Sequence, residues 1–187
     1  MTILHIDSSI TGDNSASRAI SAAVVDRLRA EQPGVAVEYR DLAAEPVAHL
    51  TLAALGGENA DLAQFLAADT IVIGAAMYNF GVPSQLKAWL DRILIAGQTF
   101  RYTATGPEGL VGDKRVILAV ARGGLYGADQ PGAALEHVET YLRGVFGFIG
   151  VSDPEVIVAE GLAIGPEQRE AAVSAALVEA RGLALAA

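Results

Sequence analysis

The chain has 187 residues, a length that suits one domain at about 150 residues per domain. Hydrophobic residues make up 52% and charged residues 19%, so the chain can bury a sizeable core and a disordered protein is excluded. The formal net charge of −9, with no run of Lys or Arg, disfavours nucleic acid and anionic membrane surfaces as partners. The absence of cysteine excludes disulfides, thiol catalysis and thiolate metal sites. Because we find no signal peptide and no apolar stretch of about 18 residues, we expect a cytoplasmic protein.

Strand and helix patterns alternate along the whole chain. Five short apolar runs predict strands, at residues 2–7, 35–39, 69–75, 116–120 and 155–159. Helical spacing or helix-start residues predict helices that end before Pro33, span residues 61–67, run from Pro83 to Leu94, span 133–148 and start at Pro166. Residues 41–57 are expected to be mostly irregular with a short helix, and residues 97–113 to form a long loop.

Strands separated by helices predict a doubly wound α/β fold with a parallel sheet. Sheets of this kind bind ligands beyond the carboxyl ends of their strands. The loops that follow Asp7, Ala75, Val120 and Ala159 are therefore the candidate binding loops.

The first of these loops is rich in hydroxyl groups and directly precedes a predicted helix. Its hydroxyl-bearing residues are Ser8, Ser9, Thr11, Ser15 and Ser17. Hydroxyls beside a helix N-terminus suit a phosphate, although a single one would be enough for an ordinary helix cap. The loop lacks both the Gly-Lys-Ser/Thr ending of a P-loop and the three glycines of a dinucleotide site. This composition favours a terminal phosphomonoester over a diphosphate.

The loop after the third predicted strand places two aromatics around an amide. Tyr78 and Phe80 form either a hydrophobic plug under the next helix or a wall for a flat heteroaromatic ring, whose polar edge Asn79 would bind. After the fourth predicted strand, Gly123 and Gly124 either make a turn or let backbone N–H groups approach a ligand. A flat ring and a phosphomonoester together describe FMN, a cofactor that itself carries the reactivity.

At these three loops the sequence resembles the FMN-dependent NADH azoreductase family, within the flavodoxin-like quinone reductase superfamily. The motifs are Ser-Ser-Ile-Thr-Gly-Asp-Asn-Ser-Ala-Ser-Arg at 8–18, Met-Tyr-Asn-Phe-Gly-Val-Pro-Ser-Gln-Leu-Lys at 77–87 and Ala-Arg-Gly-Gly at 121–124, with further similarity at 99–102, 106–110 and 147–150. The resemblance runs essentially from end to end.

The resemblance implies one flavodoxin-like, FMN-binding domain over residues 1–187, with a five-stranded sheet in the order 2-1-3-4-5 and helices on both faces. It implies an enzyme that takes hydride from NADH or NADPH and passes two electrons to quinones or aromatic azo compounds in a ping-pong cycle. It also implies a homodimer with the active site at the interface. Aromatics that one small domain cannot easily cover favour the same homodimer, namely Tyr78, Phe80, Tyr102, Tyr126 and Phe148.

The resemblance assigns no catalytic side chain, because the flavin carries the chemistry. It implies that FMN is held by Ser9, Ser15, Ala16, Ser17, Met77, Tyr78, Asn79, Phe80, Ala121, Arg122, Gly123 and Gly124. Tyr102, Phe146 and Phe148 match aromatics that line the family's substrate pocket. The chain departs from the family at Ala121, where many members have Ser, and in segment 47–61, which is short.

Other functions have less support in the sequence. His5, His49 and His137 show no metal-ligand spacing, so no metal site is expected. The lack of a Gly-x-Ser-x-Gly elbow disfavours a serine hydrolase. A dehydrogenase with Asp41 on a ribose is disfavoured by the missing glycine fingerprint. A flavodoxin-type electron carrier, which would not turn over nicotinamide, stays open as an alternative.

Overall fold

The computed structural model describes residues 1–55 and 59–184. Its main sheet is parallel and has the strand order β2-β1-β3-β6-β7, which is 2-1-3-4-5 when the sheet strands alone are counted. The strands are β1 (Thr2–Asp7), β2 (Ala36–Asp41), β3 (Thr70–Ala76), β6 (Arg115–Ala121) and β7 (Glu155–Ala159). The predicted doubly wound fold is confirmed.

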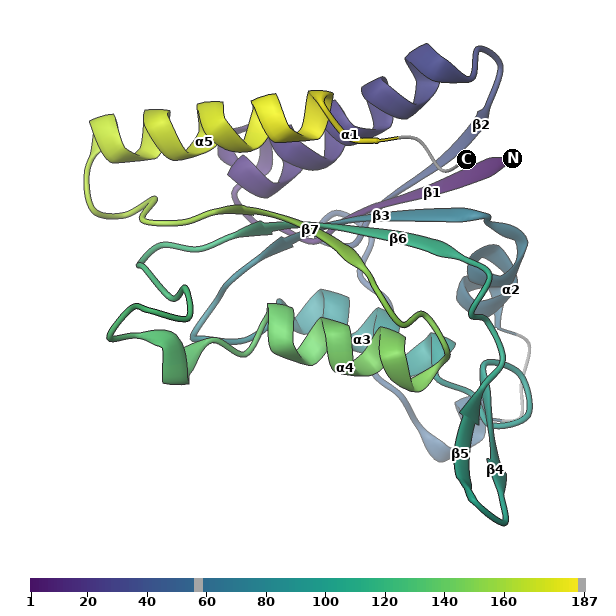
Figure 1. Ribbon diagram of the computed structural model, residues 1–187. Helices are drawn as coiled ribbons and strands as arrows, with labels where there is room; N and C mark the ends of the chain where they lie inside the picture. Colours follow the sequence, from purple (N-terminus) through teal and green to yellow (C-terminus); the bar gives the residue numbers. More distant parts are fainter. Residues whose placement is uncertain (56–58, 185–187) are drawn as a thin grey trace.

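Helices cover both faces of this sheet (Figure 1). The α-helices are α1 (Ala16–Glu31), α2 (Ala60–Ala67), α3 (Ser84–Ile93), α4 (Glu139–Phe148) and α5 (Pro166–Arg181). Three short 3₁₀ helices are η1 (Gly12–Asn14), η2 (Leu52–Leu55) and η3 (Ala133–Leu135). On one face α1 and α5 pack over Ile3, Val72 and Ile117. On the other face α2, α3 and α4 enclose a second core around Trp89 and Phe146. Every residue of β3 is buried, as the near-continuous apolar run predicted.

The strand register brings the candidate binding loops to one edge of the sheet. Asp7 lies opposite Gly74, and Ala121 pairs with both Ala76 and Ala159. Gly74 makes room for its neighbour, since a Cβ there would lie 2.2 Å from Asp7 Oδ1. The loops after β1, β3, β6 and β7 therefore meet at their carboxyl ends, where the fold class places ligands.

The prediction of a long loop over residues 97–113 is wrong. The segment contains an antiparallel hairpin of β4 (Phe100–Thr103) and β5 (Gly106–Gly109), which projects away from the sheet (Figure 1). The base of the hairpin is held against α4, because a Cβ on Gly109 would lie 2.1 Å from the Ile149 backbone. Because glycine is unfavourable within a strand, the sequence gives no strand signal for β5. The strand forms because its glycines allow this close packing.

The predicted helix over residues 133–148 is also wrong as one unit, because the structure divides it into η3 and α4. The carboxylate of Glu136 accepts hydrogen bonds from the N–H groups of Val138 and Glu139, both at 2.9 Å, and so starts a new helix. The short helix expected within residues 41–57 is η2, while residues 56 and 57 of that segment lie outside the described residues.

None of the helices in residues 1–55 and 59–184 is long and apolar enough to cross a bilayer. Within the same residues, no group of three or more His, Asp or Glu side chains could hold a metal ion.

Candidate functional site

The start of α1 forms a cradle for an anion. Ser15 caps the helix by accepting a hydrogen bond from the Arg18 N–H at 3.3 Å, and the Ser15 and Ser17 hydroxyls lie 3.1 Å apart. The N–H groups of Ala16 and Ser17 belong to the first turn, and we find no partner for either among the described residues. Two unpaired N–H groups, two hydroxyls and the positive end of the helix dipole favour a bound phosphate.

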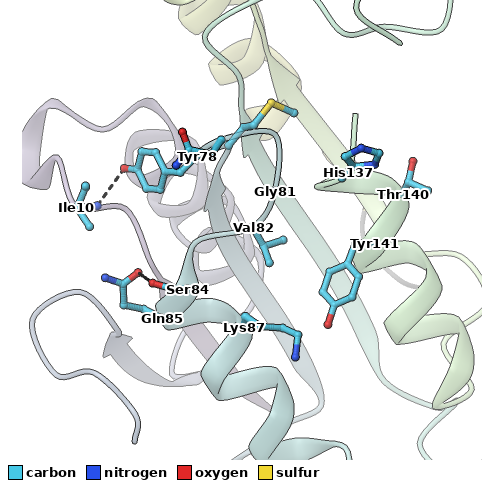
Figure 2. Close-up of a pocket in the computed structure, with 12 residues that line it drawn as sticks. Ile10, Tyr78, Gly81, Val82, Ser84, Gln85, Lys87, His137, Thr140 and Tyr141 are labelled. Atoms are coloured by element: carbon cyan, nitrogen blue, oxygen red, sulfur yellow. Dashed lines mark hydrogen bonds between the residues drawn. The ribbon is translucent and has the colours of Figure 1, made fainter. Parts of the chain in front are cut away.

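Tyr78 links this first loop to the loop after β3. Its hydroxyl lies 3.0 Å from Ser9 Oγ. The same hydroxyl accepts a hydrogen bond from the Ile10 N–H at 3.1 Å, as Figure 2 shows. Ser9 Oγ in turn lies 3.0 Å from the hydroxyl of Thr11. The two loops are therefore held together by side-chain hydroxyls.

Arg18 holds the first loop in place through hydrogen bonds from its guanidinium group. Its guanidinium donates to the Ser9 carbonyl oxygen at 2.7 and 3.3 Å and to both oxygens of Asp41 at 2.7 and 2.8 Å. The hydrogen bond from Arg18 is the largest cause of a lowered pKa for the Asp41 carboxyl. Asp41 is thus engaged in an internal ion pair, a further observation against its binding a ribose.

The loop after β3 closes in a strained two-residue turn. Tyr78 and Gly81 exchange two backbone hydrogen bonds, each 3.1 Å long, and Asn79 and Phe80 between them have φ values of 49° and 70°. Both central residues of such a tight turn need positive φ, which Asn tolerates and Phe does not. The ring of Phe80 meets Tyr126 edge-on, with centroids 6.3 Å apart.

The loop after β6 presents two backbone donors. The carbonyl oxygens of Gly123 and Gly124 accept hydrogen bonds from Ala163 and Gly161, both at 2.8 Å. Their own N–H groups have no partner that we find within the described part of the chain. Neither glycine has a positive φ, but a Cβ on Gly124 would lie 3.1 Å from the Tyr126 ring. A requirement for positive φ therefore does not explain either glycine, and a Cβ on Gly124 would crowd the Tyr126 ring.

Arg122 joins three loops beneath this turn. It is 3% exposed, and its guanidinium lies 2.7 Å from Glu139, 3.3 Å from Glu136 and 3.6 Å from Glu160. Burial alone would raise the pKa of Glu136, but hydrogen bonds from the start of α4 and the charge of Arg122 outweigh it and lower that pKa. Arg122 Nε is buried without a hydrogen-bond partner among the described residues.

A cavity of about 500 Å³ brings most of the predicted cofactor residues together. Its lining contains Ser9, Ser15, Ala16, Met77, Tyr78, Ala121, Arg122 and Gly123 from the prediction. It also contains residues that the prediction did not include, namely Thr11, Asn14, Ala76, Leu162, Ala163 and Arg169. Of the remaining predicted residues, Ser17 is buried under the loop, Phe80 is 44% exposed, and Gly124 lies outside the lining. The loop after Ala159 was a candidate from topology, but nothing in its composition singled out individual residues.

A second cavity, of about 1010 Å³, adjoins the first and shares Met77 and Tyr78 with it. Asn79 lines this second cavity, which lies between the start of α3 and the start of α4 (Figure 2). Its polar lining includes Lys87, whose Nζ donates to Asp91 at 2.5 Å, and Tyr141, whose pKa is raised by burial. A flat ligand in the first cavity would have open space beside it.

The three predicted substrate-pocket aromatics are placed differently from one another. Phe146 is fully buried in the core and lines none of the cavities near the site. Phe148 lines a third cavity of about 410 Å³, which shares Thr140 and Tyr141 with the second. Tyr102 is 75% exposed on the hairpin. Phe100, absent from the prediction, contacts both Phe148 and Tyr102, with ring centroids 4.7 and 5.6 Å away.

A family model described as a flavodoxin-like fold matches residues 1–183. The chain belongs to this family. The FMN-dependent NADH:quinone oxidoreductase 2 of Bradyrhizobium diazoefficiens is 58% identical over 199 residues, with 98% of each chain covered. A protein named FMN-dependent NADH:quinone oxidoreductase from Methylorubrum extorquens is 55% identical over 200 residues, again with 98% of each chain covered.

Solved structures give the same assignment. An azoreductase from Bacillus anthracis strain Sterne is 28% identical with a TM-score of 0.89, and 97% of each chain is covered. An FMN-dependent NADH-azoreductase from Bacillus anthracis strain Ames Ancestor, solved in complex with FMN, is 28% identical with a TM-score of 0.84 and covers 96% of this chain and 97% of its own. The family resemblance inferred from the three loops is confirmed.

Proposed function

We propose that the chain is an FMN-dependent oxidoreductase that uses NADH or NADPH to reduce quinones and aromatic azo compounds, with residues 1–187 forming one FMN-binding domain. The observation that carries this proposal is the cavity of about 500 Å³, which joins the anion cradle of α1 to Met77, Tyr78 and Gly123. The names of the relatives and of the solved structures support the cofactor and both acceptor classes.

The donor groups of the site fit FMN at both of its ends. Ser15 and Ala16 line this cavity, so the Ser15 hydroxyl and the Ala16 N–H group would hold the phosphate, and the fully buried Ser17 would support Ser15 through their paired hydroxyls. The unpaired N–H groups of Gly123 and Gly124 would face the polar edge of the ring. The loop after β3, from Met77 to Phe80, would form the ring wall. FMN, when bound, supplies the two-electron chemistry, so no acidic or basic side chain is needed for it.

The residues around the ring would support the reaction in two ways. Backbone donors fixed from behind by Gly161 and Ala163 would stabilise negative charge that develops at the ring edge, without reorganisation. The adjoining cavity of about 1010 Å³ offers one open space beside Met77 and Asn79. Because donor and acceptor would use this space in turn, we expect ping-pong kinetics.

We further propose that the enzyme is a cytoplasmic homodimer with the active site at the interface. The half-buried apolar residues around the third cavity support this, since α4 presents Val145 and Phe148 beside Leu94. Apolar surface of this kind, adjoining a ligand cavity, usually marks an interface.

The first experiment tests the cofactor. We expect the purified protein to have a flavin absorbance spectrum and to release FMN rather than FAD on heating. Replacing both Ser15 and Ser17 by Ala should weaken FMN binding by a few kcal/mol, taking about 1.5–3 kcal/mol for each charge-assisted hydrogen bond. Unchanged FMN affinity in that double variant would show that the phosphate binds elsewhere.

The second experiment tests the activity. Steady-state rates are measured with NADH or NADPH against a benzoquinone and an azo dye. Parallel double-reciprocal lines are expected for a ping-pong enzyme. A flavin-containing protein that consumes no nicotinamide with either acceptor would instead be a flavodoxin-type carrier.

A further inference from the structure

Three arginines approach the anion cradle, and they differ in how their charge is balanced. Arg18 is paired with both oxygens of Asp41, and Arg122 lies among three glutamates. For Arg169, in contrast, we find no carboxylate within 4.0 Å among the residues the structure describes. Of these three cations, Arg169 is therefore the one whose charge is not already neutralised.

Arg169 is held over the cradle by the first turn of α5. Pro166 begins this helix, and the guanidinium of Arg169 donates to the carbonyl oxygen of Asn14 in η1 at 2.7 Å. Among residues 1–55 and 59–184, that is the one hydrogen bond we find for a side chain with five N–H donors. Arg169 lines the same cavity as Ser9, Thr11 and Ser15, which puts it on the same cavity as their hydroxyls.

A phosphomonoester in this cavity would need such a cation. It carries a charge of about −1.5 to −2 at neutral pH, whereas the start of a helix contributes only about +0.5. The chain itself has a net charge of −9, so its overall field repels the ligand. One unpaired guanidinium can supply both a full charge and paired N–H donors.

We propose that Arg169 binds the phosphate of FMN across the cavity from the first turn of α1, and so selects FMN over riboflavin. This assignment rests on the proposed cofactor. It gives α5 a role in cofactor recognition that no residue of the first loop can replace, since the hydroxyls there carry no charge.

The experiment compares two ligands that differ only in the phosphate. Dissociation constants for FMN and for riboflavin are measured by flavin fluorescence with flavin-free protein, for the wild type and for Arg169→Met. We expect the variant to bind FMN about tenfold to a hundredfold more weakly, which corresponds to losing a charge-assisted hydrogen bond, and to bind riboflavin within about twofold of the wild type. Raising the salt concentration should weaken FMN binding less in the variant than in the wild type.

Two further variants separate charge from anchoring. Arg169→Gln keeps an amide donor but has no charge, so it should resemble Arg169→Met. Arg181→Met removes a cation from the last turn of the same helix and should leave both dissociation constants unchanged. Thermal unfolding followed by circular dichroism checks that each variant is folded.

The outcomes are distinct. Equal weakening of FMN and riboflavin by Arg169→Met would mean that the side chain only anchors η1, and unchanged binding of both would mean that it does not touch the phosphate; either overturns the inference. Wild-type protein that binds neither flavin would overturn the proposed cofactor, and this inference with it. Weaker binding of FMN alone, in both the Met and Gln variants, supports the assignment.

Discussion

Phe80 occupies a backbone region that bulky side chains rarely adopt, with φ at 70°. A Cβ there crowds the following carbonyl oxygen, and glycine alone avoids the clash. We predict that Phe80→Gly is more stable than Phe80→Ala by about 1 kcal/mol, because both variants lose the ring but only the alanine keeps the crowding. Urea unfolding of the flavin-free variants measures the difference. Equal stability of the two would show that the turn stores no strain.

His5 makes the pH dependence of stability testable at a single residue. On β1 and beneath α1, its Nε2 lies 2.9 Å from Ser21 Oγ and 3.4 Å from Asp7 Oδ2. Burial lowers the pKa of His5 and outweighs the attraction of Asp7. A base whose pKa falls on folding stabilises the native state above its unfolded pKa of about 6.5, and this stability is lost as the pH falls below that value. Burial also raises the pKa of Asp7, which favours the folded state at low pH and therefore acts in the opposite direction.

We therefore predict that His5→Gln flattens the decline in unfolding free energy between about pH 7 and pH 5. Because the charge of His5 also lowers the pKa of Asp7, the same replacement is made in an Asp7→Asn background, where the difference isolates the histidine. The matched control is His49→Gln, which changes an exposed histidine and should keep the wild-type slope. If the slope of His5→Gln equals that of the wild type, His5 does not become protonated on unfolding in this range.

Individual site residues could be predicted where the chain carries them in one short loop. The hydroxyls of Ser9, Ser15 and Ser17 stand directly before a helix, which is a local signal that needs no knowledge of packing. Arg169 gives no such signal, because it becomes part of the site only when α5 folds back over η1. The unpaired N–H groups of Gly123 and Gly124 likewise depend on contacts with the loop after β7.

At the scale of secondary-structure elements, Arg122 links the ends of β6 and β7 to the start of α4. Its removal would leave Glu136, Glu139 and Glu160 without their shared cation in a largely buried place. Breaking a buried ion pair by removing one partner usually costs about 3–5 kcal/mol. We predict a loss of this size for Arg122→Met in urea unfolding.

The control for this prediction is Arg143→Met. Arg143 also donates to Glu139, at 2.9 Å, but its side chain is 41% exposed, so its loss should cost no more than about 1 kcal/mol. If the two variants lose similar unfolding free energy, the ion pairs of Arg122 stabilise the fold no more than a surface ion pair does.

The elements that the sequence predicts well are those whose signal does not depend on distant contacts. β3 is a run of apolar residues long enough to identify, and Pro166 marks the start of α5. The β4–β5 hairpin lacks such a signal, because its second strand contains Gly106, Pro107 and Gly109. The break between η3 and α4 depends on how the Glu136 side chain turns back onto the backbone, which periodicity does not reveal.

For the whole molecule, topology was the most predictable property. Alternating strands and helices allow few arrangements, and a parallel sheet with crossover helices places all strand ends at one edge. The edge itself therefore followed from the sequence. The shapes of the three adjoining cavities did not, since they depend on Tyr78 bridging two loops and on the positions of α3 and α4.

The face formed by α3 and α4 is where we expect a second copy of the chain to pack. Val145 on α4 lines the third cavity beside Leu94 and Phe148, and a carboxylate placed there would be buried without a partner in a dimer. We predict that Val145→Glu changes the mass measured by light scattering from dimer to monomer and lowers quinone reduction. Val178→Glu makes the same replacement at a 70% exposed position on α5, which covers the opposite face of the sheet, and should leave a dimer. An active wild-type protein with a monomeric mass would contradict the proposed interface.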